Sequence, residues 1–187
     1  MLLATPVLTF LEGKKVLKKP WTEEKDVNFG PAVGSKRIWL LDNPDVPTTA
    51  TSLEVPNVSS RFGTDPLFWN YLFYLIRAIP TPVLKNRDAM QAFALFSEPI
   101  VRIVDKLVTS TNAMREDDIS SSGTVVTTAK IVHPDLESCR GLATAAFALE
   151  VLKGTVPPGV WYPAELPPVA RKNILEAVRE ETLTYEL

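Results

Sequence analysis

The sequence has very few of the residues on which common catalytic and metal sites depend. It contains one cysteine, Cys139, and one histidine, His133. One cysteine cannot form a disulfide within the chain, and it makes a Cys-rich structural zinc site implausible. One histidine excludes most catalytic triads, and no H-E-x-x-H, G-x-S-x-G or Cys–His constellation is present. A catalyst of this composition would depend on carboxylates, arginines or that one histidine.

The sequence also lacks a dominant charge and a long apolar run. The net charge of -2 and the pI near 5.5 give no electrostatic footprint for nucleic acid. No apolar run approaches the roughly 20 residues that span a bilayer. The opening MLLATPVLTFL has no basic stretch and is broken by Pro6, so we interpret it as a strand rather than a signal peptide. We expect the protein in the cytoplasm or another reducing, soluble compartment.

Nucleotide-binding fingerprints are absent as well. Neither G-x-G-x-x-G after a strand nor G-x-x-x-x-G-K-[ST] occurs, and FGPAVGS has neither the spacing nor the following helix. We therefore expect no cofactor to be bound by this chain alone.

The order of the predicted elements favours an α+β fold. The predicted strands come first, as a hairpin turning at 12–13 and a strand over 36–41. Helices over 66–79 and 86–108 follow, then a second hairpin over 111–133, and then helices over 139–153 and 169–181. This order predicts a single domain over 1–187, with a mixed, mainly antiparallel sheet covered by helices. The segment 42–58 is expected to be irregular or a short helix.

Two apolar helices are predicted in the middle of the chain. Asp65 followed by Pro66 predicts an N-cap and first turn, and PLFWNYLFYLIRAI is apolar almost all round, which indicates deep burial or an interface. The helix over 86–108 has an apolar stripe that we assign to the core, and Pro99 is expected to kink or divide it.

The helix that begins near Cys139 combines small residues with a rigid exit. The small residues would let another backbone or sheet approach closely, so this helix is expected to lie flat against an extended segment: Gly141, Ala143, Ala145 and Ala148. Gly154 is placed for a left-handed C-terminal cap. The prolines at 157–158 then fix an open exit.

Three residues are candidates for substrate binding. Arg61 lies at a strand end and could hold a carboxylate, or it could form a salt bridge to a neighbour such as Asp65. His133 ends a strand before a helix N-terminus, with Arg140 a turn or two further on. The same His-Pro-Asp segment is also a simple corner in which Asp135 caps the helix.

Several motifs in order resemble one family. VNFGPAVG, IWLLDNPDVP, VPNVSSRFGTDPLFWN, FSEPIVRIVDKLV and GLATAAFALEVLKGTVPPGVWYPAEL are together similar to the C-terminal part of saccharopine dehydrogenase-like oxidoreductases. The resemblance covers the chain from about Val7 onward. It implies an α+β domain on a mixed sheet that supplies substrate contacts and dimer surface, with NAD(P) bound by an N-terminal Rossmann domain. We expect that half to be missing here, so the chain would be an excised domain, part of a split enzyme, or a relic in another use.

Two main hypotheses follow from the resemblance and from the apolar helix. In the first, the chain is the substrate-binding and dimerisation domain of an NAD(P)-linked oxidoreductase, not catalytically complete alone, whose partner is a Rossmann domain of the same or a partner chain. In the second, it is a non-catalytic docking subunit, for which Trp21, Trp39, Trp69 and Trp161 would be interface anchors if exposed. A homodimer or larger assembly is expected in either case. A third, an independent small-ligand binder, depends only on the corner of His133 and Arg140.

Overall fold

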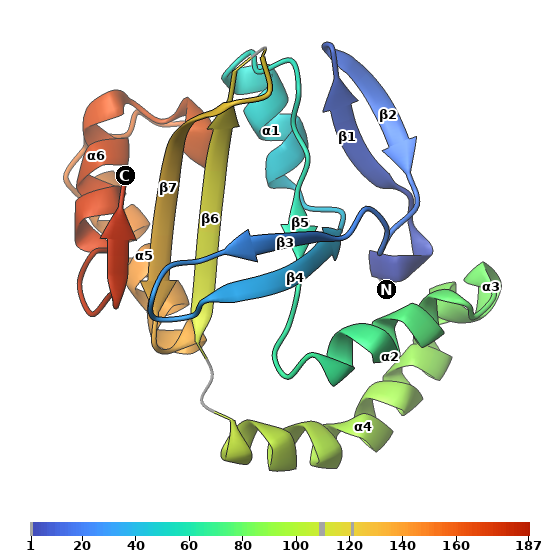
Figure 1. The fold of residues 1–187 in the computed structure, drawn as a ribbon. Coiled ribbons are helices and arrows are strands. Elements are labelled where there is room, and N and C mark those ends of the chain that lie inside the picture. The colour runs from blue at the N-terminus through green and yellow to red at the C-terminus, as the bar shows by residue number, and fades with distance from the viewer. Residues whose placement is uncertain (1, 109–110, 121) are drawn as a thin grey trace. The chain divides into compact units, whose positions relative to one another are not determined.

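The fold is α+β, as predicted, with antiparallel strand pairing (Figure 1). The computed structural model describes residues 2–108, 111–120 and 122–187. The strands form three small sheets rather than one. The chain divides into two compact units, the first comprising 1–27 and 37–108, the second 28–36 and 109–187. The single-domain organisation therefore stays a prediction, and each unit is described by itself.

The first unit begins with a short 3₁₀ turn, η1 (Leu2–Ala4), and the predicted hairpin of β1 (Val7–Leu11) and β2 (Lys14–Lys18). Glu12 and Gly13 have φ values of 50° and 74°. Two successive residues with positive φ form the tight turn whose twist matches that of paired strands. The prediction of this hairpin is confirmed.

The second sheet consists of β3 (Lys25–Asn28), β4 (Ser35–Leu40) and β5 (Arg61–Phe62), with β4 in the middle. The predicted strand over 36–41 corresponds to β4. Of the two alternatives for 42–58, the structure has a short helix, α1 (Asp45–Ser52). The residues between β3 and β4 belong to the second unit.

A pair of stacked tryptophans forms the centre of the first core. The rings of Trp21 and Trp39 lie 5.2 Å apart and nearly parallel, and both are almost fully buried. The Trp21 indole N–H donates to the carbonyl of Asn70 at 2.9 Å. These two tryptophans are therefore core residues and cannot serve as interface anchors, because side chains of η1, of Leu41 and of three helices already surround them.

Three helices complete the first unit: α2 (Phe68–Arg77), α3 (Thr81–Lys85) and α4 (Arg87–Leu107). The prediction that Asp65 caps α2 is wrong, since the helix begins three residues later with Leu67 at the N-cap. The reason is local. The side-chain amide of Asn70, within the helix, forms two hydrogen bonds with the backbone of Thr64. Its oxygen accepts from the Thr64 N–H at 2.9 Å, and its nitrogen donates to the Thr64 carbonyl at 2.6 Å.

Helix α4 has the predicted extent. The Asn86 side chain accepts from the backbone N–H of Ala89 at 3.0 Å, and Val108 is the C-cap. The helix continues through Pro99 without dividing. The assignment of its stripe to the core is wrong. Met90 packs against the tryptophan core, but most of the large apolar side chains after it are exposed.

The second unit contains a three-stranded antiparallel sheet of β6 (Asn112–Ile119), β7 (Val125–His133) and β8 (Thr184–Glu186), with β7 in the middle. The long predicted hairpin corresponds to β6 and β7, and β8 lies beyond the last predicted helix. Two helices, α5 (Leu136–Leu152) and α6 (Pro168–Ala177), and a 3₁₀ turn, η2 (Pro163–Glu165), complete the unit.

Helix α5 begins three residues before the predicted start near Cys139, with Asp135 as the cap that the corner alternative expected; its end is as predicted, but it packs differently. The Asp135 carboxylate accepts from the backbone N–H of Ser138, and Gly154 has a φ of 72°. The buried face of α5 meets α6 through Ala146 and Ala170. Gly141 is exposed, and a Cβ there would meet nothing within 4 Å. The expectation that the small residues lie against an extended segment is therefore wrong within the described structure.

Candidate functional site

Arg61 is held by a network inside the first unit. Its guanidinium donates to the Ser59 hydroxyl at 3.0 Å and pairs with the Glu23 carboxylate at 3.5 Å. Glu23 also accepts an ion pair from Lys18 at 2.7 Å. The side chain of Arg61 is about one-quarter exposed. The salt-bridge alternative thus describes Arg61 in this structure, with Glu23 as the observed partner, and a role toward a substrate stays a prediction.

His133 is the last residue of β7 and is buried. Its Nδ1 lies 2.6 Å from the Asp135 carbonyl oxygen and 3.2 Å from the Asp135 backbone nitrogen. Its Nε2 is also buried and has no hydrogen-bond partner among the described residues. Since Asp135 also caps α5, the imidazole stabilises the corner between strand and helix.

Arg140 lies on the first turns of α5, beyond this corner, and is exposed. Its carbonyl accepts from the Thr144 hydroxyl at 2.8 Å. Among the described residues its guanidinium has no hydrogen bond or ion pair. His133 and Arg140 therefore share one corner of the second unit, whereas Arg61 belongs to the first unit.

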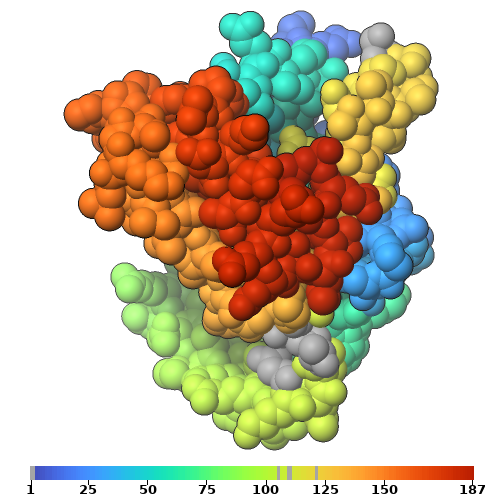
Figure 2. Space-filling model, turned by 90° about the vertical axis from the view of Figure 1, so that its left-hand side faces the viewer, coloured from blue at the N-terminus to red at the C-terminus, as the bar shows by residue number. Residues whose placement is uncertain are grey.

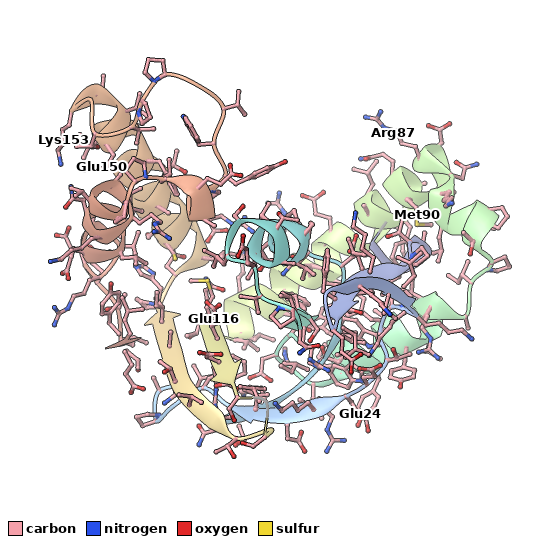
Figure 3. All side chains as sticks on the ribbon, turned by 90° about the horizontal axis from the view of Figure 1, so that it is seen from above. Glu24, Arg87, Met90, Glu116, Glu150 and Lys153 are labelled. Atoms are coloured by element: carbon pink, nitrogen blue, oxygen red, sulfur yellow. The ribbon has the colours of Figure 1, made fainter. Side chains whose placement is uncertain are left out.

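A buried carboxylate fixes the other end of α5. Glu150 is only 2% exposed and accepts from Lys153, Thr155 and Asn173, at 2.7–2.9 Å (Figure 3). Because the Thr155, Asn173 and Lys153 side chains stabilise the charged form, the pKa of Glu150 is lowered to about 2. The cluster connects α5, the turn after it and α6. It is a structural polar centre, since its three donors are all engaged with the one carboxylate.

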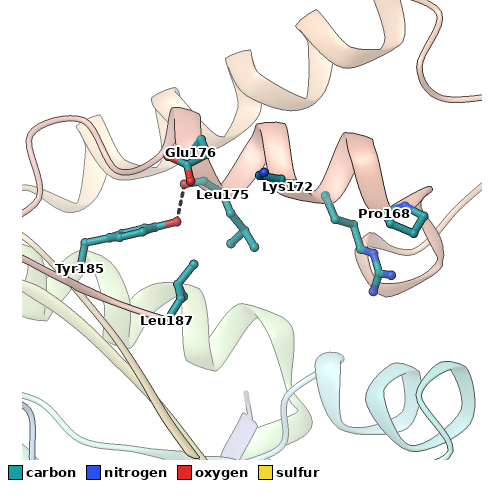
Figure 4. A pocket seen from close by; sticks show the side chains of 7 residues that line it. Pro168, Lys172, Leu175, Glu176, Tyr185 and Leu187 are labelled. Carbon is teal, nitrogen blue, oxygen red and sulfur yellow. Dashed lines mark hydrogen bonds between the residues drawn. The ribbon is translucent and has the colours of Figure 1, made fainter.

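A shallow pocket of about 300 Å³ lies between α6 and β8 (Figure 4). The space-filling view shows these C-terminal segments side by side on the surface (Figure 2). The pocket combines two cationic side chains, one carboxylate and apolar walls: Pro168, Arg171, Lys172, Leu175, Glu176, Tyr185 and Leu187.

Of the polar groups that line this pocket, one forms a hydrogen bond within the fold and one has no hydrogen-bond partner among the described residues. The Tyr185 hydroxyl donates to the Leu175 carbonyl at 2.8 Å, and burial raises the pKa of this phenol. Arg171 Nε is buried and has no hydrogen-bond partner in the described structure. Cationic groups beside apolar walls suit an anion with an apolar part, such as a carboxylic acid.

None of the three predicted site residues lines this pocket. The sequence features that could have indicated this pocket are the Arg171-Lys172 pair in the predicted last helix and Tyr185 beyond that helix. Nothing in the local pattern brings these two segments together. Only the pairing of β8 with β7 places Tyr185 against α6.

Helix α4 carries an uncovered apolar surface in the first unit. Met90 and Arg87 project from its first turn (Figure 3), and Met90 is the residue that joins the tryptophan core. Beyond it, a row of large apolar side chains is open to solvent. Their exposed fractions are 41% for Phe93, 75% for Phe96, 50% for Ile100, 61% for Ile103 and 80% for Leu107. An apolar row of this extent is typical of a surface that receives a partner.

Neither protein-family models nor the sequences of curated proteins match this chain. None of the described helices has the length and apolar content needed to cross a bilayer. Within residues 2–108, 111–120 and 122–187, no group of three or more His, Cys, Asp or Glu side chains is arranged to hold a metal ion.

Proposed function

We propose that this chain is the substrate-binding and dimerisation domain of a saccharopine dehydrogenase-like, NAD(P)-linked oxidoreductase, and that it is not catalytically complete by itself. The motifs described above support the family, and the α+β fold is consistent with it. The dinucleotide would be bound by a Rossmann domain elsewhere in the same protein or in a partner chain.

The observation on which this proposal depends most is the open apolar row of α4. A domain that works together with other domains needs apolar surface to receive them, and burial of such a row contributes roughly 25 cal/mol per Å² of area removed from water. The row spans five large side chains of one helix. A self-sufficient domain would bury it.

The substrate-binding part of the proposal is supported by the pocket between α6 and β8. Arg171 and Lys172 would attract the carboxylate of a substrate, and Leu175 would contact its apolar part. Arg61, His133 and Arg140 remain candidates for substrate binding by resemblance to the family motifs.

Two measurements test the proposal. The isolated chain is titrated with NADH and NADPH while dinucleotide fluorescence is followed, and we expect no saturable binding. The protein is then recovered from its native source under mild conditions and identified by mass spectrometry. We expect either a longer form of this chain or a stoichiometric partner, with a G-x-G-x-x-G segment after a strand.

Tight binding of NADPH to the isolated chain would refute the assignment. So would recovery of the chain at its present length with partners that lack a dinucleotide-binding segment. The second result would favour the other candidate function.

That other candidate is a non-catalytic docking subunit of a larger assembly. The observation that favours it is a second exposed apolar group, on the segment that follows α5. Val160 is fully exposed, and Trp161 and Tyr162 are about half exposed. Exposed aromatic side chains of this kind are frequent anchors of protein interfaces.

A further inference from the structure

The exposed row of α4 has the spacing of a coiled-coil seam. Its members follow one another at intervals of four, three, four, three and four residues: Ala89, Phe93, Phe96, Ile100, Ile103 and Leu107. Alternating steps of three and four place apolar side chains along one line of a helix that packs lengthwise against another helix. The opposite face is polar, and Glu98 and Arg102 form an ion pair there at 2.6 Å.

We propose that the α4 seam binds the α4 seam of a second copy of this chain, with the two helices antiparallel. This inference rests on the proposed function, because it gives the dimerisation role a surface and a geometry. The dimer axis would pass at the level of Glu98. An isologous contact about a two-fold axis requires a surface that is complementary to itself.

The side chains of the seam are complementary in size to those of a second, antiparallel copy. When two copies are antiparallel about residue 98, Phe96 faces Ile100, Phe93 faces Ile103, and Ala89 faces Leu107. Every layer therefore combines a larger side chain with a smaller one, and all six positions are used. In a parallel pair each residue would face itself, which would put Phe against Phe in two layers and Ala against Ala in another. Interdigitation of large and small side chains fills a core better than such a pairing.

The flanking positions agree with a partner of the same sequence. On the two sides of the antiparallel seam, Ser97 lies beside Ser97, Pro99 beside Pro99, and Lys106 beside Ala92. No like charges meet. Charged flanking residues normally direct a coiled coil toward a different, oppositely charged helix, and these positions offer almost no charge for such a partner to recognise.

The area is sufficient for a reversible dimer. With about 150–200 Å² for each fully open side chain of this size, the five exposed seam residues leave roughly 500–600 Å² uncovered per copy. Two copies would thus hide about 1,000–1,200 Å², near the lower limit of specific interfaces. Interfaces near this limit are those of weak or transient complexes, so we expect a reversible dimer rather than a permanent one. Helix α4 has 21 residues and is about 31 Å long, so all layers fit within it.

Two substitutions at facing positions test both the surface and the direction of the helices. In Phe96→Glu and in Ile100→Lys, each dimer would bury two unpaired charges against apolar groups, and we expect association to weaken at least about 100-fold. Both residues are about half exposed or more in the single chain, so the first unit should remain folded. Far-UV circular dichroism and the fluorescence of the buried tryptophans check this. Leu95→Glu is the matched control, because Leu95 is 60% exposed but lies off the seam, and this variant should dimerise as the unchanged chain does.

Mixing the two variants distinguishes the two directions. In an antiparallel pair the introduced glutamate of one copy would face the introduced lysine of the other, while the remaining Ile100 and Phe96 keep their native contact. We therefore expect the equimolar mixture to recover a dimer that neither variant forms alone. In a parallel pair the introduced glutamate would face the unchanged Phe96 of the other copy, and mixing would recover nothing. The readout is mass by sedimentation velocity, from well below to well above about 10 µM.

The inference is overturned if the unchanged chain is monomeric over this range, if Phe96→Glu leaves dimerisation intact, or if the mixture stays monomeric. Its failure differs from failure of the proposed function. A monomeric chain that is recovered from its source with a dinucleotide-binding segment would refute the seam and the dimerisation role, and would leave the assignment to an NAD(P)-linked oxidoreductase standing. A dimer formed through the seam, recovered from the source without any dinucleotide-binding segment, would refute the oxidoreductase assignment and leave the seam standing.

Discussion

Replacing Trp21 by phenylalanine should destabilise the first unit by about 2–4 kcal/mol. The indole N–H donates to the buried carbonyl of Asn70 at 2.9 Å, in addition to the hydrogen bond which that carbonyl accepts within α2, and loss of the indole bond costs about 1–1.5 kcal/mol. The smaller ring also reduces the contact with Trp39, whose ring centroid is 5.2 Å away, and with Phe73, at 4.9 Å. Lost apolar burial and the space left behind add about 1–2 kcal/mol.

Urea unfolding followed by far-UV circular dichroism measures this change. We expect the midpoint to fall while the slope stays the same, because the unfolded surface is nearly unchanged. Trp161→Phe is the matched control: Trp161 is 44% exposed, and its replacement should change stability by no more than about 0.5 kcal/mol. A loss below about 1 kcal/mol for Trp21→Phe would refute the reasoning that the stacked tryptophans are the centre of this core.

Three further substitutions test the second unit and α4. The pKa of the Glu150 carboxyl is about 2 in the folded protein and near 4.5 in the unfolded chain, so the stability that this group contributes is fully present above pH 4.5 and is lost as the pH falls toward 2. Glu150→Gln should therefore reduce the difference in melting temperature between pH 7 and pH 3. Ala170→Leu should overpack the contact between α5 and α6 and lower the unfolding free energy by about 1–3 kcal/mol, whereas Val169→Leu on the exposed side should be nearly neutral, as urea titration would show. Asn86→Ala should cost about 1 kcal/mol and reduce the helical signal in circular dichroism, and Asn86→Asp should restore it.

Features determined within a few residues could be predicted from the sequence. Glu12-Gly13 requires positive φ at neighbouring positions, and Asn86 and Asp135 each supply a side-chain oxygen three residues before a free backbone N–H. Such signals act locally, so no knowledge of the rest of the chain is needed. The hairpins, the extent of α4 and the Asp135 cap of α5 follow from them.

Features that depend on distant segments could not be predicted in this way. Arg61 and Glu23 are 38 residues apart, and only the pairing of β4 with β5 brings them together. The pocket between α6 and β8 likewise exists because β8 pairs with β7. The start of α2 differs from the cap pattern because the Asn70 amide, which such a pattern ignores, determines the turn at Thr64.

The two packing predictions that failed have one physical cause. The stripe of α4 and the small-residue face of α5 each predict a covering partner, but an apolar or small face does not indicate which molecule supplies it. Beyond Met90, α4 has little packing to hold it, whereas most helical stability in proteins comes from tertiary packing of an apolar face. Its caps and intrahelical ion pair contribute only about 1 kcal/mol or less each. A helix that keeps a regular seam over five turns under these conditions lacks a covering partner in its own unit, and this is why we propose an interface for α4 rather than a place in the core.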